Sequence, residues 1–374
     1  MTGTQTIAAQ TITAQTISGR PTLSVIVPAR NEEACLGGCL QSLVAQRGLD
    51  FEIIVVDDHS TDRTREVAQS FQGVQIIEAG PLPDRWTGKN NAMSAGARTA
   101  RGAWLLFTDA DTVHLPGSLP RSVHEAKRQG AALLSYSPQQ IVNGFWERAV
   151  MPVIFAELAS CYRPSEVSDP ASPAAAANGQ YLLITREAYD AVGGHAAIAS
   201  NLLEDVALAR AVKCSGRRIW FRYGGDAVHT RMYRSWSQLR EGWTKNLALL
   251  FPSPGLLAIW RGVEFVLVIA CLAAMVHALR SRDYLHAVLY AVIPVLTFTR
   301  IRRAHFPWAA NILALLGLPL FSYLLLRSKR AYANGRVSWK GRTYSESATH
   351  YASGSTQLPA SPGAGTTSLL QSHR

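Results

Sequence analysis

From Leu23 to Phe251 the sequence alternates short apolar runs with amphipathic segments, and this alternation constrains the fold more than any other feature. Continuous apolar runs are typical of strands buried on both faces, whereas the segments between them repeat their apolar residues at helical spacing. The runs are LSVIVPA, FEIIVVDD, VQIIEA, AWLLFTDAD, AALLSYSP, GQYLLITR and RRIWFRYG. This pattern predicts an α/β domain with a mainly parallel sheet flanked by helices.

Acidic residues follow two of the predicted strands. Asp57 and Asp58 end the second run, and Asp109 and Asp111 end the fourth. Because an unpaired carboxylate is costly to bury, a strand gains no stability from ending in two of them. Ligands of open parallel sheets bind beyond the carboxyl ends of the strands. The sequence therefore predicts a binding site at this edge.

Five segments carry these acids and other polar residues in a fixed order. They are VIVPARNEE, VVDDHSTDRT, GKNNAMSAGARTARGAWLLFTDADT, NGQYLLITREAYDAVGG and LLEDVALARAVKCSG. Together they resemble the family 2 glycosyltransferases, nucleotide-sugar enzymes with the GT-A fold, over roughly Leu23 to Phe251. Within that family the chain is most similar to membrane-associated enzymes that glycosylate lipids, including hopanoid-associated and carotenoid-type glycosyltransferases.

The acids of the second strand are expected to bind the donor nucleotide. A carboxylate can accept hydrogen bonds from a base N–H or a ribose hydroxyl, and the resemblance assigns such contacts to Asp57 and Asp58, with Pro28 and Glu32 beside the same pocket. Turn and cap chemistry is the alternative. Lys89 opens a predicted helix, where its ammonium can meet a diphosphate bound at the helix N-terminus. A solvated lysine is the alternative there.

Asp109 and Asp111 are predicted to hold a metal ion. In an extended D-x-D both side chains can point the same way and share one divalent cation, which prefers oxygen ligands. The resemblance assigns Mg or Mn to this motif and a nucleotide contact to Asp109. The cation would neutralise charge as the diphosphate leaves. Helix capping by two acids is the alternative.

The segment LLEDVAL contains the predicted catalytic residue. Glu204 and Asp205 start a helix, whose dipole favours carboxylates, so capping alone would explain one of them. The resemblance places the general base at Asp205, which would take a proton from the acceptor while a single displacement inverts the anomeric carbon. Glu204 would support the base or bind the acceptor. Asn178 and Gly179 match positions that line the donor-sugar and acceptor pocket, with a simple turn as the alternative.

The segment QLREGWTKN departs from the processive polysaccharide synthases of the family, which carry Q-x-x-R-W. Trp243 is retained and is predicted to stack on an acceptor, but Gly242 stands where Arg is expected. This departure favours transfer of a single sugar over polymerisation. A polysaccharide synthase remains an alternative, as does a nucleotidyltransferase, although PARNEEACLGG is not the Gly-rich phosphate loop that the latter needs.

Three apolar stretches follow, at residues 255–276, 284–299 and 306–326. The third has the length and lack of charge expected of a membrane span. The second is short and contains Pro294, and the first contains Arg261 and Glu264. From Arg280 to Arg342 the chain has eleven Lys or Arg and one acid, and basic residues beside apolar segments indicate contact with lipid head groups rather than nucleic acid.

The sequence predicts four parts: a disordered tail (1–22), a GT-A domain (23–253), a membrane region of two or three helices (254–330), and a basic anchor with a disordered tail (331–374). The first part lacks the features of a signal peptide, so we expect a multi-pass protein of the cell membrane with a cytoplasmic catalytic domain. Three crossings would put the segments RSKR and WKGR outside, against the positive-inside rule. Two crossings, with residues 255–276 in the interface, avoid this. The oligomeric state is left open.

Overall fold

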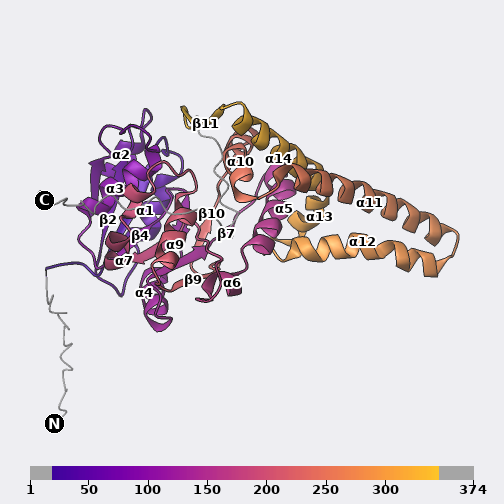
Figure 1. Ribbon diagram of the computed structural model, residues 1–374, viewed down its shortest axis with the longest axis horizontal. Coiled ribbons are helices and arrows are strands. Elements are labelled where there is room, and N and C mark those ends of the chain that lie inside the picture. Colours follow the sequence, from indigo (N-terminus) through magenta and orange to yellow (C-terminus); the bar gives the residue numbers. More distant parts are fainter. Residues whose placement is uncertain (1–18, 345–374) are drawn as a thin grey trace, which may run out of the picture.

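The computed structural model describes residues 19–344 (Figure 1). The tail expected before residue 23 therefore lies almost wholly outside the described residues, and the tail expected after residue 344 lies outside them altogether. Within the described part, an α/β unit is joined to a group of long helices.

A seven-stranded sheet with the order β3-β2-β1-β4-β8-β6-β9 forms the centre of the α/β unit. The strands are β1 (Leu23–Ala29), β2 (Phe51–Asp57), β3 (Val74–Glu78), β4 (Trp104–Phe107), β6 (Leu133–Ser137), β8 (Leu182–Thr185) and β9 (Ile219–Tyr223). Strands β1 to β4 run parallel, and only β8 is antiparallel to its neighbours in this sheet. The mainly parallel sheet expected from the sequence is confirmed, and its arrangement is typical of the GT-A fold.

Helices cover both faces of this sheet. They include α1 (Leu36–Val44), α2 (Thr64–Gln69), α3 (Gly88–Thr99), α4 (Ser118–Arg128), α7 (Arg186–Ala191) and α9 (Glu204–Cys214). Successive residues of a strand point to opposite faces. Thus Ile26 of β1 packs in the core that contains α3 and α9, whereas Val25 and Val27 pack in the core that contains α1 and α4. Two-sided burial explains the continuous apolar runs.

A smaller sheet, β5-β10-β7, stands at the carboxyl edge of the large one. Its strands are β5 (Thr112–His114), β7 (Gln139–Gln140) and β10 (Val228–Thr230). Strand β5 begins directly after Asp111, and Thr230 donates a hydrogen bond to the Asp111 carbonyl (Oγ1–O 3.3 Å). The small sheet therefore fixes the backbone of the D-x-D segment.

Six further helices form the second part of the molecule, whereas the short α6 (Pro164–Ser168) and α8 (Gly194–Ala197) contact β9 and α3 of the α/β unit. The six are α5 (Phe145–Cys161), α10 (Trp236–Leu250), α11 (Pro254–Arg280), α12 (Tyr284–Arg302), α13 (Trp308–Leu313) and α14 (Gly317–Ala333). Figure 1 shows α11 and α12 as a long hairpin that projects away from the α/β unit. Three segments are long and apolar enough to cross a membrane: Pro254–Arg280, Tyr284–Arg302 and Trp308–Ala333.

The charges inside the first apolar stretch are paired with one another. Arg261 of α11 contacts Glu157 of α5 (Nε–Oε1 3.0 Å) and Glu264 (Nη1–Oε2 2.5 Å). Arg300 of α12 contacts Glu264 (Nη2–Oε2 3.0 Å) and Glu157. Paired charges turned toward neighbouring helices are compatible with a membrane span. Residues 255–276, which are expected in the interface, belong to α11, which pairs with α12 in this hairpin (Figure 1) and is also long and apolar enough to cross a membrane.

The chain returns to the α/β unit after α14. The last described elements, β11 (Val337–Trp339) and β12 (Arg342–Tyr344), form a two-stranded hairpin whose charged side chains reach residues at the ends of β1 and β2. Sequence analysis predicts a basic anchor at the membrane here, but these side chains instead meet carboxylates of the α/β unit.

Candidate active site

Two adjoining cavities lie beyond the carboxyl ends of β1, β2 and β4, where sequence analysis predicts the site. The first has a volume of about 460 Å³ and the second about 360 Å³. Of the predicted site residues, the first cavity is lined by Pro28, Glu32, Asp58, Lys89, Asp109, Asp111 and Glu204, and the second by Lys89, Asp109, Asn178, Gly179, Glu204, Asp205 and Trp243. The two cavities share Lys89, Asp109 and Glu204 at their border.

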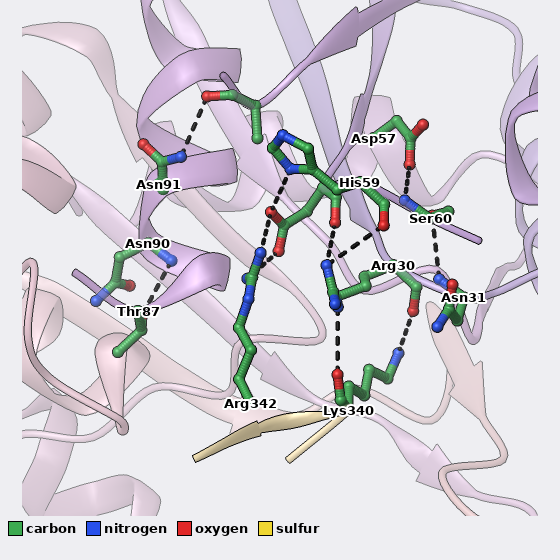
Figure 2. Close-up of polar contacts among 12 residues, drawn as sticks. Arg30, Asn31, Asp57, His59, Ser60, Thr87, Asn90, Asn91, Lys340 and Arg342 are labelled. Carbon is green, nitrogen blue, oxygen red and sulfur yellow. Dashed lines mark hydrogen bonds and ion pairs between the residues drawn. The ribbon is translucent and has the colours of Figure 1, made fainter. Parts of the chain in front are cut away.

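The two acids that end β2 point in different directions. Asp58 lines the first cavity, whereas Asp57 accepts a hydrogen bond from the Ser60 N–H (N–Oδ1 3.0 Å) and closes a turn. Figure 2 shows this separation, with Asp57 facing Ser60 and Arg342 approaching from the other side. The structure thus places Asp58 in the wall of the first cavity and gives Asp57 the turn chemistry that was its alternative.

Two cations of the C-terminal hairpin meet the acids of the first cavity. The Arg342 guanidinium makes a bidentate ion pair with Asp58 (Nη1–Oδ2 2.5 Å, Nη2–Oδ1 2.9 Å). Lys340 pairs with the Glu32 carboxylate and donates to the Arg30 carbonyl (Nζ–O 3.0 Å; Figure 2). Sequence analysis missed both residues as parts of the site, since they lie about 300 positions from their partners. The only signal was the charged, aromatic segment VSWKGRTY in an otherwise polar tail.

Lys89 contacts an acid of the D-x-D motif and an acid of the LLEDVAL segment. It lies in the first turn of α3, whose Thr87 cap accepts a hydrogen bond from the Asn90 N–H (3.1 Å). Its ammonium pairs with Asp109 (Nζ–Oδ1 2.8 Å) and Glu204 (Nζ–Oε1 2.7 Å). Burial opposes the charged form, but the two carboxylates raise the pKa of Lys89 well above its ordinary value. Lys89 is thus a fixed cation on the border of the cavities.

Asp111 supplies an acceptor that the protein leaves unpaired. Its Oδ1 is buried and has no hydrogen-bond partner within residues 19–344. Burial, followed by the charges of Asp109 and Glu32, raises the pKa of Asp111 to about 7. A buried acceptor normally has a partner, so a cation at this position would satisfy it.

Asp109 and Asp111 suit a divalent cation that is also bound by the phosphates of a substrate. Among the described residues no three His, Cys, Asp or Glu side chains group as a metal site. Mg²⁺ is commonly bound by one or two carboxylates together with substrate phosphates and water. Asp109 and Asp111 offer that partial set, so the donor atoms suit a cation that arrives with a diphosphate.

Asp205 stands at the N-terminus of α9 and faces the second cavity. Its carboxylate accepts hydrogen bonds from the backbone N–H groups of Gly179 and Val206 (both 2.8 Å). Burial and the neighbouring Glu204 raise the pKa of Asp205 to about 6. A carboxylate with this pKa is ionised near neutral pH and can accept a proton.

Gly179 lies close to three of these groups. A Cβ at this position would lie 3.2 Å from both Glu204 Oε1 and Lys89 Nζ, and 3.6 Å from Asp205 Oδ2. The preceding Asn178 turns its side-chain oxygen toward the Gln180 N–H (3.0 Å), which shapes this turn. The glycine therefore lets the backbone pass beside three functional side chains.

Trp243 is part of the wall of the second cavity. Only 2% of the residue is exposed, and its ring lies 6.2 Å from Phe155 and 6.1 Å from Tyr233 between centroids. Its ring lines the second cavity, so stacking of Trp243 on an acceptor stays a prediction. The neighbouring Gly242 also has a structural cause, because a Cβ there would collide with the Tyr233 ring. No side chain fits where the synthases carry Arg.

Comparison with known proteins agrees with the resemblance. Residues 24–192 match the family described as Glycosyl transferase family 2. The 4,4'-diaponeurosporenoate glycosyltransferase of Staphylococcus aureus is 26% identical over 337 residues, which cover 86% of this chain and 88% of the relative.

Two solved structures were also compared. A mannosyltransferase from Pyrobaculum calidifontis, in complex with GDP-Man and Mn2+, is 16% identical with a TM-score of 0.48 over 83% of this chain and 87% of that one. Glucosyl-3-phosphoglycerate synthase from Mycobacterium tuberculosis, in complex with Mn2+, UDP and phosphoglyceric acid, is 23% identical with a TM-score of 0.41 over 61% and 78% of the two chains.

Proposed function

We propose, because residues 24–192 match glycosyltransferase family 2, that this chain is an enzyme that transfers one sugar from a nucleotide-diphosphate sugar to a membrane lipid, with inversion at the anomeric carbon. One observation carries the proposal. A polar cavity lined by Asp58, Asp109 and Asp111 adjoins a second cavity that contains Asp205, and Lys89 stands on their border. Such neighbouring cavities suit a donor and an acceptor that meet at one point.

The first cavity is the proposed donor site. Asp58 can accept hydrogen bonds from the base or ribose of a nucleotide, and the family resemblance favours a uridine nucleotide. A divalent cation, Mg or Mn, held by Asp109 and Asp111 would neutralise charge on the diphosphate leaving group. Lys89 adds a fixed positive charge beside Asp109. These residues hold the sugar at the border of the second cavity.

Asp205 is the proposed general base. Its hydrogen bonds to Gly179 and Val206 orient the carboxylate, and a pKa of about 6 lets it take a proton at neutral pH. The proton leaves the acceptor hydroxyl as that oxygen bonds to the anomeric carbon and the diphosphate departs. Glu204 holds Lys89 in place beside it.

The proposed acceptor is a lipid that carries a hydroxyl or carboxyl group. The similarity to the 4,4'-diaponeurosporenoate glycosyltransferase of Staphylococcus aureus supports a carotenoid-type lipid here. The candidate membrane helices support a multi-pass protein of the cell membrane with a cytoplasmic catalytic domain. An acceptor could then react without leaving the bilayer.

Membranes that contain the enzyme, incubated with labelled nucleotide sugars and then extracted, provide the test. We expect label in a lipid that bears a single sugar. Label found only in a long polymer would instead identify a polysaccharide synthase, and release of diphosphate from a nucleoside triphosphate would identify a nucleotidyltransferase. A membrane preparation that lacks the protein is the control.

A further inference from the structure

One face of α5 forms an apolar wall of the second cavity. Phe155, Leu158, Ala159 and Tyr162 all line the cavity. Their spacing of three and four places them on one side of the helix. Asp205 lines the same cavity, so the space has both an apolar wall and a reactive carboxylate.

Another part of the cavity wall comes from the end of the α11–α12 hairpin. The loop after α12, residues 303–306, which we call the junction loop, contributes Arg303, Ala304 and His305 to the lining. Phe306 of the same loop is buried and lies 5.9 Å from Phe155 between ring centroids. The end of the hairpin and α5 therefore both contribute to the wall of this cavity.

The junction loop is held in a strained conformation. His305 has φ +60°, a left-handed value that is uncommon outside glycine. Its ring stacks on Tyr223 (centroids 4.2 Å apart, planes at 13°), and its carbonyl accepts from the Gln139 side chain (Nε2–O 3.2 Å). The Tyr223 hydroxyl in turn bonds to Gln139. Strain that is held by several contacts indicates that the position of this loop has a role.

We propose that the acceptor is an elongated apolar molecule that enters end-first between α5 and the junction loop, and that only its oxygen-bearing end is enclosed. This inference rests on the proposed function. The second cavity, at about 360 Å³, is near the small end of the range for small-molecule sites, so a long lipid does not fit whole. The rest of the chain lies in the bilayer along α11 and α12, whose apolar side chains are exposed.

Filling the mouth of the cavity tests the proposal. Ala159 lines the cavity and is exposed, so Ala159→Trp places an indole in the entrance without disturbing the core. Ser160→Trp is the matched control, because Ser160 is the next exposed residue of α5 and does not line either cavity. The probe is cis-parinaric acid, a fluorescent long-chain carboxylate, titrated into the full-length enzyme in detergent. Binding of UDP, measured by calorimetry, reports on the first cavity.

We expect Ala159→Trp to weaken binding of the probe by at least roughly ten-fold, about 1.4 kcal/mol, while Ser160→Trp binds like the wild type and all three bind UDP equally. If Ala159→Trp binds the probe as tightly as the wild type, the probe lies on the outer face of α11 and α12 and the proposal is overturned. If Ala159→Trp also lost UDP binding, Ala159→Leu would decide: a partial weakening of probe binding supports the proposal, and none overturns it. A wild-type enzyme that binds no UDP would instead contradict the uridine donor of the proposed function.

Discussion

At the scale of single residues, Asp205 carries the most specific prediction. Asp205→Asn keeps the shape of the side chain and its place at the start of α9 but removes the proton acceptor. We expect the turnover number to fall by about 10²- to 10⁴-fold, the usual contribution of a general base. UDP binding should be unchanged, since Asp205 lines only the second cavity. Loss of UDP binding would contradict this role.

The pH dependence of transfer follows from the same carboxyl group. Burial and Glu204 raise the pKa of Asp205 to about 6, and only its ionised form can accept a proton. The rate should therefore fall as the pH drops through about 6 and level off above it, as measured by kcat/KM over a pH series. UDP binding over the same series separates this effect from titration in the first cavity. An acid limb near the ordinary Asp value of about 4 would contradict the assignment.

Because one carboxylate oxygen of Asp111 has no partner among the described residues, we expect a bound divalent cation to raise the melting temperature. A ligand that binds only the folded state raises the melting temperature. Mn²⁺ with UDP should therefore stabilise the wild type, and Asp111→Asn should lose most of that shift, as followed by fluorimetry. Asp57→Asn is the matched control, because Asp57 faces Ser60 outside both cavities. An equal shift in wild type and Asp111→Asn would exclude Asp111 as a ligand.

Gly179 tests how closely the backbone must approach the acids. In Gly179→Ala the added Cβ presses on Glu204 and Lys89 at 3.2 Å, which displaces the groups beside Asp205. Misplacement of catalytic groups by about 1 Å can cost 10²-fold, so we expect kcat to fall roughly ten- to hundred-fold. Gly38→Ala, in α1 with no atom within 4 Å of the new Cβ, should leave kcat unchanged. A full-rate Gly179→Ala enzyme would show that this turn tolerates a side chain.

At the scale of elements, the C-terminal hairpin contributes charge to the first cavity. Arg342→Ala removes the bidentate partner of Asp58 and leaves a carboxylate that is 6% exposed without this cation. The cavity becomes more negative, so a nucleotide diphosphate should bind more weakly. We expect the donor KM to rise roughly ten-fold, in line with about 1.5–3 kcal/mol for a hydrogen bond between charged groups. Arg336→Ala, exposed just before the hairpin, is the control, and equal KM values would assign Arg342 no part in donor binding.

The same elements show what could be predicted from the sequence. Strands β1 to β4 and the acids at their ends could be predicted from local patterns, because a strand that is buried on both faces has a continuous apolar sequence. The pairing of Arg342 with Asp58 has no local signal, since it depends on the whole path of the intervening chain. The burial of Trp243 was missed for the same reason, because its neighbour Phe155 comes from a distant helix.

At the scale of the whole molecule, the path of the chain predicts two membrane crossings. Helices α11 and α12 form an exposed apolar hairpin that projects away from the α/β unit (Figure 1). Only 11% of the most apolar stretch of α11 and 22% of that of α12 are buried. In the third candidate segment 44% is buried, and α14 packs against α5 and α10 before the chain returns to the first cavity. Two crossings by α11 and α12, with α14 held on the catalytic side, satisfy these contacts and keep the basic residues after α14 inside.

This arrangement predicts opposite labelling of two new cysteines. Ser281→Cys lies at the tip of the hairpin, between α11 and α12, and should react with a membrane-impermeant maleimide added to intact cells. Asn334→Cys lies directly after α14 and should react only once the membrane is opened, because the hairpin that follows it must reach Asp58 and Glu32. The unsubstituted protein controls for its five native cysteines. Labelling of Asn334→Cys from outside would require three crossings, and then Arg342 could not meet a cytoplasmic Asp58.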